Sequence, residues 1–338
     1  MDNLTPSIED EIADVKFGRP HVVILGAGAS LAAFPKGDGN GVQLPLMVNL
    51  AEVAGIENEL ESAKIDYRGK NFEEVYSSLS ENPDHASLRL EIEEAIYQYF
   101  AKMRLPTGPT IYDHLILSLR EKDLIATFNW DPFLYLSCLR NHKHAKLPHC
   151  VYLHGSVAIG YCLEHKTKGM MGYTCSVCRK PYRPSKLLYP VLKKNYTVDP
   201  FIAGEWQTLR NYLKSAYLVT IFGYGAPKSD VEAIALMKDA WGDINKRELE
   251  EFEIVDIKSS DELAETWRDF IHTHHYITTD DFYKSHIAKH PRRTCEAMWN
   301  QLMECKFLQD NMMPKELSFD MLYGWLTPLM AAESKKMK

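Results

Sequence analysis

Four residues of types that bind metal ions occur as two pairs in one short stretch of the chain. Cys162 and His165 form a C-x2-H pair, and Cys175 and Cys178 form a C-x2-C pair. Thiolate and imidazole ligands in this number and spacing suit a tetrahedral zinc ion, and four protein ligands leave no open position for catalysis. The sequence therefore predicts a structural zinc site. Free thiols beside an unrelated histidine are the alternative.

A second group of reactive side chains follows two expected strands. Asn129 and Asp131 come directly after the first strand, and His154 follows the second. Such a set can orient a ribose, hold a water molecule and move a proton. Taken singly, the Asn and Asp suit a helix cap and the His suits a turn. Because the three follow consecutive strands, we predict that they form a catalytic set.

Two glycine-containing turns also follow expected strands, at Gly26-Ala27-Gly28-Ala29-Ser30 and at 223–230. Glycines let the backbone turn tightly and approach a phosphate. Leu31 stands at the third glycine of the G-x-G-x-x-G fingerprint, and the usual acidic residue about 20 positions later is not evident. A turn that needs only small residues, or a helix cap at Ser229 or Asp230, explains each turn alone. Together, the two turns favour nucleotide binding.

These residues must be positioned by an alternation of strands and helices. Short apolar runs predict buried strands at 21–25, 124–128, 151–153, 217–222 and 252–257. Helical patterns fall mainly at 46–54, 72–79, 88–103, 111–119, 201–214 and 231–241. Strands separated by helices give a mostly parallel sheet that is covered on both faces. We predict a doubly wound, Rossmann-like α/β fold.

Two regions depart from this alternation. Residues 159–186 predict a small inserted zinc module, because they are rich in Lys, Gly and Cys. After Asp261 we expect the strands to stop and a helical C-terminal extension to begin. The predicted division is therefore a domain at 1–258, interrupted by the module at 159–186, and an extension at 259–338.

Composition and charge narrow the class of protein. The 338 residues are 45% hydrophobic and carry a net charge of −7. Between positions 140 and 195, eleven basic residues face one acidic residue, a net +10 that leaves −17 elsewhere. An anionic ligand or partner, or merely a solvated basic lobe, accounts for this asymmetry.

The remaining composition favours a cytoplasmic protein without membrane spans. No run approaches the roughly 18 apolar residues of a membrane span. Seven cysteines without a dense framework indicate a reducing compartment. The four cysteines outside the zinc motif are expected to be buried apolar residues; these are Cys138, Cys150, Cys295 and Cys305.

In their order along residues 21–257, these motifs resemble the sirtuin (silent information regulator) superfamily of NAD-consuming enzymes. The resemblance comprises the first glycine turn, the Asn-x-Asp, the Leu-His-Gly at 153–155, the zinc knuckles and the second glycine turn. It implies that Asn129 and Asp131 set the nicotinamide-ribose pocket and that His154 is the general base on a ribose hydroxyl. It also implies NAD-binding roles for Gly26, Ala27, Gly28, Ser30, Asp38, Gly223, Ser229 and Asp256.

The departures from sirtuin deacylases fall mostly in features that bind the peptide. Residues 34–40 replace a Gly-Ile-Pro-Asp-Phe-Arg segment, and residues 187–190 replace a Phe-Gly-Glu stretch. One knuckle is Cys/His, and Asp256 replaces an Asn expected at the adenosine ribose. The pattern is more similar to sirtuin-like NADase domains of bacterial antiphage systems, including residues 41–50 and 291–296.

We therefore predict an NAD glycohydrolase that contains a structural zinc ion and produces nicotinamide and ADP-ribose. Because unregulated NAD cleavage harms a cell, we expect gating by a homo-oligomer or by a partner defence protein such as an ATPase or nucleotide-sensing subunit. The alternatives are an NAD-dependent protein deacylase and a catalytically silent subunit that binds NAD or ADP-ribose. A nucleic-acid-binding zinc module is permitted by the basic segment, but no interleaved aromatic array supports it.

Overall fold

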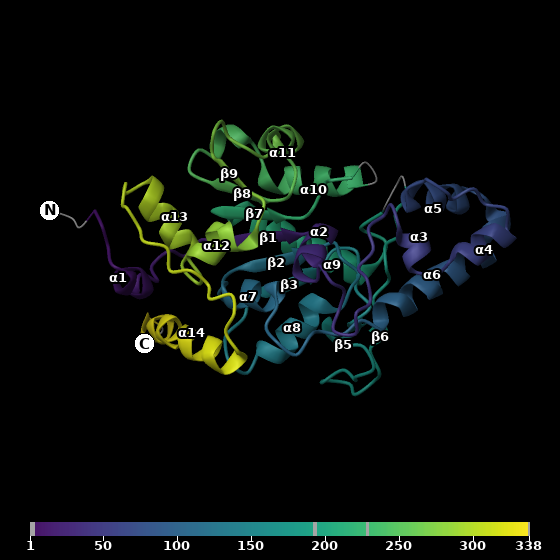
Figure 1. Cartoon of the computed structure of the whole chain (residues 1–338), viewed down its shortest axis with the longest axis horizontal. Helices are drawn as coiled ribbons and strands as arrows, with labels where there is room; N and C mark the ends of the chain where they lie inside the picture. The colour runs from purple at the N-terminus through teal and green to yellow at the C-terminus, as the bar shows by residue number, and fades with distance from the viewer. Residues whose placement is uncertain (1–3, 192–194, 228–229, 337–338) are drawn as a thin grey trace.

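A parallel six-stranded sheet lies at the centre of the computed structural model, which describes residues 4–191, 195–227 and 230–336 (Figure 1). The strand order is β3-β2-β1-β7-β8-β9, and every neighbouring pair is parallel. The strands are β1 (His21–Leu25), β2 (Leu124–Thr127), β3 (His149–Tyr152), β7 (Leu218–Phe222), β8 (Glu251–Val255) and β9 (Tyr276–Thr279). This confirms the doubly wound fold. The order places a topological switch point between β1 and β7, where ligands bind in such sheets.

Strand β9 corrects the expectation that strands stop after Asp261. Its four residues pair in parallel with β8, with Phe252 opposite Tyr276. The strand is short and only partly buried, so its sequence has no apolar run to mark it. The rest of the extension consists mainly of helices: α11 (Ser260–Trp267), η4 (Phe282–Lys284), α12 (His286–Lys289), α13 (Thr294–Leu302) and α14 (Phe319–Lys336).

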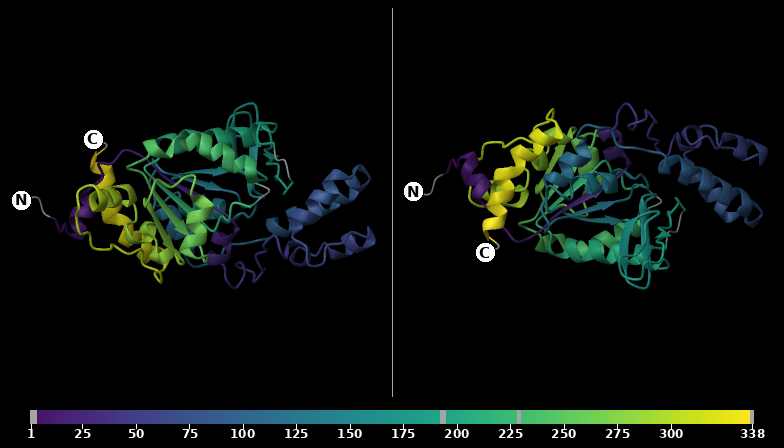
Figure 2. Two further views of the ribbon diagram at one scale, coloured as in Figure 1. Left: turned by 90° about the horizontal axis from the view of Figure 1, so that it is seen from above. Right: turned by 90° about the horizontal axis from the view of Figure 1, so that it is seen from below.

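Both faces of the sheet are covered, so alternate side chains of β1 enter different cores. Val22 and Ile24 pack in one core with α9 and α10, which lie along one side of the sheet (Figure 2). Val23 and Leu25 pack in the other core with α7, α8 and α14. Burial on both faces explains the unbroken apolar run of this strand. The helices are α7 (Ile111–Leu117), α8 (Phe133–Asn141), α9 (Pro200–Ser215) and α10 (Val231–Trp241), followed by η3 (Ile244–Lys246).

A helical lobe extends away from the sheet (Figures 1 and 2). It contains α3 (Leu50–Val53), α4 (Glu57–Ser62), α5 (Phe72–Glu81), η1 (Pro83–His85) and α6 (Ala86–Ala101), and follows α2 (Ala27–Ala33). Ile56, Leu60, Leu79 and Ile96 are fully buried within the core to which the lobe contributes. The sequence predicted helices here but no lobe, and the helix predicted at 46–54 begins only at Leu50.

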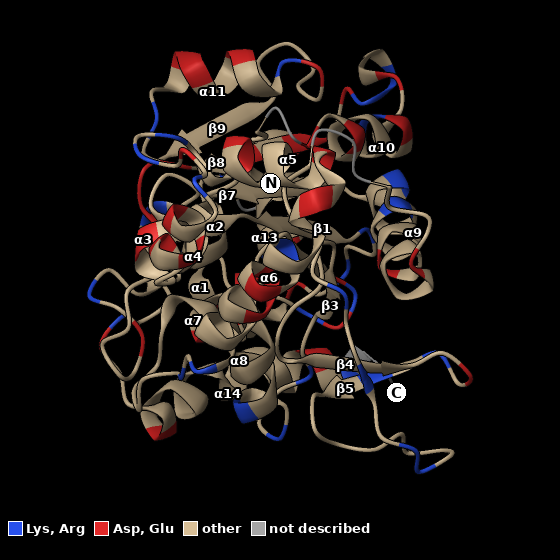
Figure 3. Cartoon of the chain, turned by 90° about the vertical axis from the view of Figure 1, so that its right-hand side faces the viewer, with Lys and Arg blue, Asp and Glu red and all other residues tan. Residues whose placement is uncertain are grey.

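Within residues 159–186, predicted as an inserted zinc module, the structure forms a separate antiparallel sheet of β5-β4-β6, which the sequence did not predict. Its strands are β4 (Ile159–Cys162), β5 (Thr167–Met170) and β6 (Arg183–Pro184). Several basic side chains of the positive segment pair with carboxylates; the pairs are Arg140–Asp113, Lys146–Glu121, Lys168–Glu205 and Lys180–Glu164. Figure 3 shows the Lys and Arg positions of this region in blue. The segment is therefore less positive at the surface than its sequence suggests.

Other features predicted from the sequence have mixed outcomes. Cys295 is buried as expected, but Cys305 is exposed, and Cys138 and Cys150 are only partly buried. Cys305 lies in a loop after α13. The prediction depended on the apolar character of the cysteine side chain, which is not enough to bury a residue in a surface loop. Among the described helices, none combines the length and hydrophobicity needed to cross a membrane.

A buried ion-pair cluster fastens α14 to the sheet domain. The guanidinium of Arg292 makes two hydrogen bonds to Glu333, of 2.8 and 2.6 Å, and Arg293 makes a third of 2.8 Å. Arg293 also donates to the carbonyl of Ile12, in the last turn of α1 (Ile8–Ala13). Both arginines are almost completely buried. Residues 291–296, noted in the sequence for a family resemblance, therefore hold both ends of the chain together.

Replacing Glu333 with glutamine is expected to lower the free energy of unfolding by about 2–3 kcal/mol, because it leaves two buried guanidinium groups without a counter-charge. This loss in the free energy of unfolding is smaller than the loss expected for a fully buried ion pair, because the Glu333 side chain is 19% exposed. Urea unfolding measures the change. Glu316→Gln, at an exposed site just before α14, is the matched control. Equal stabilities of the two variants would contradict the role of the cluster.

Candidate functional site

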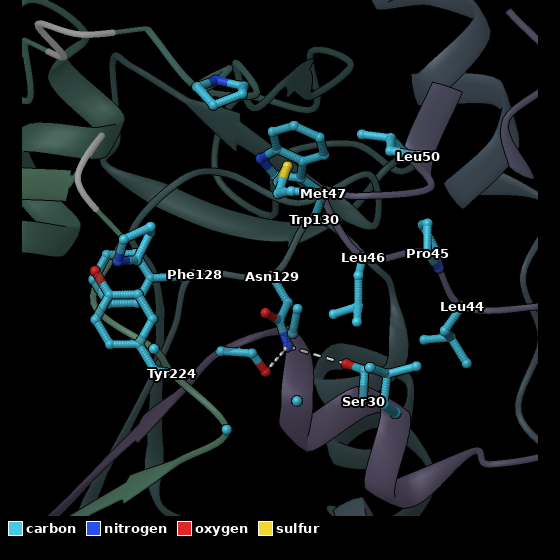
Figure 4. A pocket seen from close by; sticks show the side chains of 18 of the residues that line it. Ser30, Leu44, Pro45, Leu46, Met47, Leu50, Phe128, Asn129, Trp130 and Tyr224 are labelled. Carbon is cyan, nitrogen blue, oxygen red and sulfur yellow. Dashed lines mark hydrogen bonds between the residues drawn. The ribbon is translucent and has the colours of Figure 1, made fainter. Parts of the chain in front are cut away.

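A pocket of about 500 Å³ opens at the carboxyl ends of the strands, where the switch point predicts a ligand site. Residues that follow β1, β2, β3, β7 and β8 line it, and Figure 4 shows part of it. Its walls are largely apolar. One wall comes from the segment before α3 and the first residue of that helix, and contributes Leu44, Pro45, Leu46, Met47, Val48 and Leu50.

The two glycine turns meet at this pocket and pack directly against each other. The Gly28 amide donates to the Gly223 carbonyl oxygen at 2.9 Å. A Cβ atom on Gly26 would lie 2.5 Å from that same oxygen. Gly223 has a φ of +60°, and a Cβ there would lie 2.3 Å from the Ala29 nitrogen. Close backbone packing therefore requires these glycines, and it brings both turns to the edge of the pocket together with Ala27.

Asn129 lies between the first glycine turn and the pocket. Its Nδ2 donates to the Gly26 carbonyl at 2.8 Å and to the Ser30 hydroxyl at 3.0 Å. Figure 4 shows its amide oxygen turned away from Ser30, toward the Phe128 and Tyr224 rings. Those rings stack with centroids 4.1 Å apart. The amide is thus held in one orientation, with its acceptor facing the space of the pocket.

Ser30 connects Asn129 to Asp131. Its hydroxyl donates to Asp131 Oδ2 at 2.6 Å and lies 2.7 Å from the Tyr112 hydroxyl. Because a serine has one proton to donate, Tyr112 must donate to Ser30. Asp131 Oδ1 accepts from the Phe133 amide at 3.1 Å. Asp131 therefore also stabilises the turn that leads into α8, which is the local role that its position in the sequence suggested. Burial raises the pKa of Asp131 to about 6, while these two hydrogen bonds lower it.

The raised pKa of Asp131 predicts a pH-dependent difference in stability. Between about pH 4 and pH 6 the unfolded chain has lost this proton and the folded protein still holds it. The wild-type protein therefore loses stability relative to Asp131→Asn as the pH rises through about 6, by up to about 3 kcal/mol. Urea unfolding at pH 4.5 and pH 7 should measure about 2 kcal/mol of this difference, because at pH 4.5 the unfolded chain has already lost most of this proton. Asp261→Asn, at an exposed position, is the control, and a pH-independent difference for Asp131→Asn would refute the prediction.

His154 lines the same pocket from the turn after β3. Its Nε2 lies 3.0 Å from the Tyr196 hydroxyl and 3.7 Å from Asp230 Oδ1. The turn is fixed by Gly155, which has a φ of +77° and no room for a side chain. The predicted catalytic residues are thus brought to one pocket, as the ends of neighbouring parallel strands require.

The structure also shows residues that sequence reasoning missed: Tyr112, Trp130, Tyr196, Tyr224 and Asp230. Asp230 was considered only as a helix cap. It occupies the cap position of α10 without a side-chain cap bond, and its carboxylate accepts from the Tyr224 hydroxyl at 2.8 Å. Tyr112 and Tyr196 stand in no motif, and their partners Ser30 and His154 are distant in sequence, so no local signal marked them. Tyr224 lies within the second glycine turn, but its bond to Asp230 was not predicted.

Trp130 connects the site to the helical lobe. Its ring packs against Phe100 of α6 and against Tyr189, which follows the zinc module. Within the described part of the chain, its buried indole N–H has no hydrogen-bond partner. Such a donor is costly unless something accepts from it.

The other residues predicted to bind NAD have different outcomes. Asp256 lines the pocket just beyond β8. Asp38 is not among the lining residues; its carboxylate accepts from the backbone amides of Asn40, Val42 and Arg104 and shapes a loop instead. Ser229 lies outside the described residues.

The zinc ligands come together as their spacing predicted. Their ligand atoms all lie within 4.8 Å of one another. Cys162 Sγ is 3.6 Å from His165 Nδ1 and 3.8 Å from Cys178 Sγ, and Cys175 Sγ is 3.7 Å from His165 Nδ1. A tetrahedron with bonds of about 2.0–2.3 Å has edges of about 3.5–3.8 Å, so the four residues fit a zinc ion. None of these described ligands lines the pocket, which is consistent with a structural role.

No protein-family model matches the chain, and no curated protein matches it. Several solved structures do match. A Sir2 homologue in complex with NAD is 13% identical, covers 89% of this chain and 95% of its own, and has a TM-score of 0.39. A mutant Sir2 homologue in complex with ADP-ribose is 12% identical, with 98% of both chains covered and a TM-score of 0.36.

Sir2 bound to an acetylated peptide is 13% identical, covers 85% of this chain and 93% of its own, and also has a TM-score of 0.36. Because these identities and TM-scores are low, the matches do not assign a function, and only the residues of the site can support one. The chain is nevertheless similar, over most of its length, to Sir2 proteins, the sirtuin superfamily that the order of its motifs resembles.

Proposed function

We propose that this protein is an NAD glycohydrolase that releases nicotinamide and leaves ADP-ribose. The observation that carries the proposal is the Asn129–Ser30–Asp131 network, which is buried in the pocket at the switch point. A dinucleotide binds at this place in sheets of this strand order. The network adds polar groups on one side of a pocket that is otherwise largely apolar.

The charges of the pocket suit cleavage of the bond between nicotinamide and ribose. This reaction builds positive charge on the ribose, as in other glycosidic cleavages, and nearby carboxylates stabilise that charge. Four carboxylates line the pocket: Glu73, Asp131, Asp230 and Asp256. Lys258, an exposed side chain, is the one cation among the described lining residues.

The proposed binding mode places each part of NAD beside groups of matching chemistry. The nicotinamide ribose lies by Asn129 and Asp131, and His154 takes a proton from a ribose hydroxyl. The pyrophosphate lies along the turn at 26–30, next to Gly223. The Asp256 carboxylate accepts from the adenosine ribose hydroxyls, and Ser229 stays a prediction for the same side. Water is the acceptor of the ADP-ribosyl group.

Incubating the purified protein with NAD and measuring nicotinamide by chromatography tests the proposal. We expect nicotinamide and ADP-ribose in equal amounts, and a loss of at least about 100-fold in Asn129→Ala, because the amide that faces the ribose is removed. Asn245→Ala, at an exposed position, is the control. NAD that binds but remains intact over a wide range of protein concentrations would instead support a silent regulatory subunit.

We further propose that assembly gates this activity, either through self-association or through a partner defence protein such as an ATPase or nucleotide-sensing subunit. Unregulated NAD cleavage would exhaust the cofactor of the host. Activity per molecule is then expected to rise with protein concentration or on addition of the partner. A rate per molecule that is independent of concentration and partner would argue against gating.

A deacylase is the second candidate, and a groove favours it. This groove, of about 1060 Å³, lies between α5, α6 and the segment after β6. Leu188 lines both the groove and the NAD pocket, so an extended acyl-peptide in the groove would lie close to the pocket. Formation of O-acetyl-ADP-ribose from NAD and an acetylated peptide would favour this candidate over water as the acceptor.

A further inference from the structure

His154 is surrounded by a chain of buried hydroxyl and carboxylate groups that the proposed chemistry has not used. Tyr196 follows the zinc module, and its hydroxyl lies 3.0 Å from His154 Nε2. The same Nε2 atom lies 3.7 Å from Asp230 Oδ1, and the Tyr224 hydroxyl donates to Asp230 Oδ2 at 2.8 Å. All four side chains are at least nine-tenths buried.

Counting protons assigns a direction to these hydrogen bonds. A phenol has one proton to donate, and an ionised carboxylate has none. Tyr224 donates to Asp230. The carboxylate can only accept, and its Oδ1 atom faces His154 Nε2, so the Nε2 atom carries the imidazole proton and donates it to the Tyr196 hydroxyl. The unprotonated nitrogen of the neutral ring is Nδ1.

The placement of Asp230 indicates a role beyond folding. At the cap position of α10, an Asp side chain ordinarily accepts from the backbone amides of the first helical turn. Asp230 makes no such bond, and its carboxylate faces Tyr224 and the histidine instead. A buried carboxylate is costly unless hydrogen bonds or charges compensate it. The Tyr224 phenol supplies one such hydrogen bond.

We propose that Asp230 and Tyr196 are positioning residues that fix the tautomer of His154 and stabilise its protonated form. The proposal rests on the proposed NAD cleavage, in which a ribose hydroxyl loses its proton to Nδ1 of His154. The resulting imidazolium keeps its Nε2 proton, which it donates to Tyr196, and its charge is compensated by Asp230, whose Oδ1 atom lies 3.7 Å from Nε2. No proton reaches Asp230. The logic is that of the carboxylate beside a catalytic histidine in hydrolases.

Removing the carboxylate should therefore lower the pKa of His154, because the imidazolium loses its compensating charge. The other charged groups that line the same pocket are Glu73 of α5, Asp131 after β2, and Asp256 and Lys258 after β8. These groups are present in every variant, so their effect cancels in the comparison of wild type with Asp230→Asn and Tyr196→Phe.

Nitrogen NMR of the full chain with ¹⁵N-labelled histidine tests the relay without any need for activity. The His154 signals are assigned by their loss in His154→Gln. We expect the Nε2–H tautomer in the wild type and an imidazole pKa at least one unit lower in Asp230→Asn. Tyr212→Phe, which removes a hydroxyl on α9 and away from His154, should leave the signals unchanged. An Nδ1–H tautomer in the wild type, or an unshifted pKa in Asp230→Asn, would overturn the proposal.

Kinetics provide the second readout. In Tyr196→Phe and Asp230→Asn, kcat for nicotinamide release is expected to fall about 10- to 100-fold while KM changes less than about threefold. The acid limb of the pH profile should shift to lower pH, because a base with a lower pKa is deprotonated at lower pH. If the wild type cleaves NAD but the variants match it, the relay is wrong and the proposed function stands. If the wild type does not cleave NAD, the NMR result still decides the relay.

Discussion

Replacing His154 with alanine is expected to lower the rate of nicotinamide release by about 100- to 10,000-fold, the usual contribution of a positioned general base. His154 lines the pocket beside the residues that would hold the ribose. Among the described residues that line the pocket, His154 is the only base that follows β3, so its loss removes the proposed acceptor of the ribose proton. Binding of ADP-ribose should change less than about threefold, because in the proposed mode its phosphates, its adenine and all but one of its ribose hydroxyls contact other residues.

A matched control separates chemistry from folding in this test. His149 lies on β3, the strand that precedes His154, but is exposed at the surface, so His149→Ala should retain full activity. His154→Gln, which fills much of the same space, guards against collapse of the pocket around the shortened side chain. A His154→Ala protein that remains folded and fully active would reject the assigned base.

Loss of the zinc ion is expected to unfold the inserted module. Cys175 is the one residue between 161 and 184 that is fully buried, so the module has almost no apolar core. Structural zinc sites supply about 10–16 kcal/mol of apparent binding energy in small peptides, and here that energy would replace a core. Cys175→Ser should therefore lose most of its zinc, measured by atomic absorption, from about one ion per chain.

The consequence for the rest of the protein is also specific. Limited proteolysis of Cys175→Ser should cut within 161–184, while the sheet domain remains folded. Lys168 of β5 pairs with Glu205 of α9, and Tyr196 follows the module, so we expect activity to fall as well. Cys305→Ser changes an exposed cysteine outside the module and should keep its zinc. A zinc-free protein whose module resists proteolysis as well as the wild type would contradict a structural metal.

The fold could largely be predicted, because its signals are local. A strand buried on both faces is a continuous apolar run, and β1 and β7 show this clearly. The zinc ligands are close in sequence, so their spacing alone identified the site that the geometry then brought together. Strand β9 was missed because it is short and only partly buried. The helical lobe was missed because a helix pattern does not say against what a helix packs.

The sequence by itself determined the fold class, the metal ligands and the residues at the ends of the strands. Each of these follows from neighbours along the chain: periodicity, ligand spacing, or the position just after a strand. Only the tertiary structure decided which side chains those residues contact. Ser30 meets Asp131 across 101 positions, and His154 meets Tyr196 across 42. Hydrogen bonds of this kind depend on distances between elements, which the packing of the helices on the sheet sets and no local pattern records.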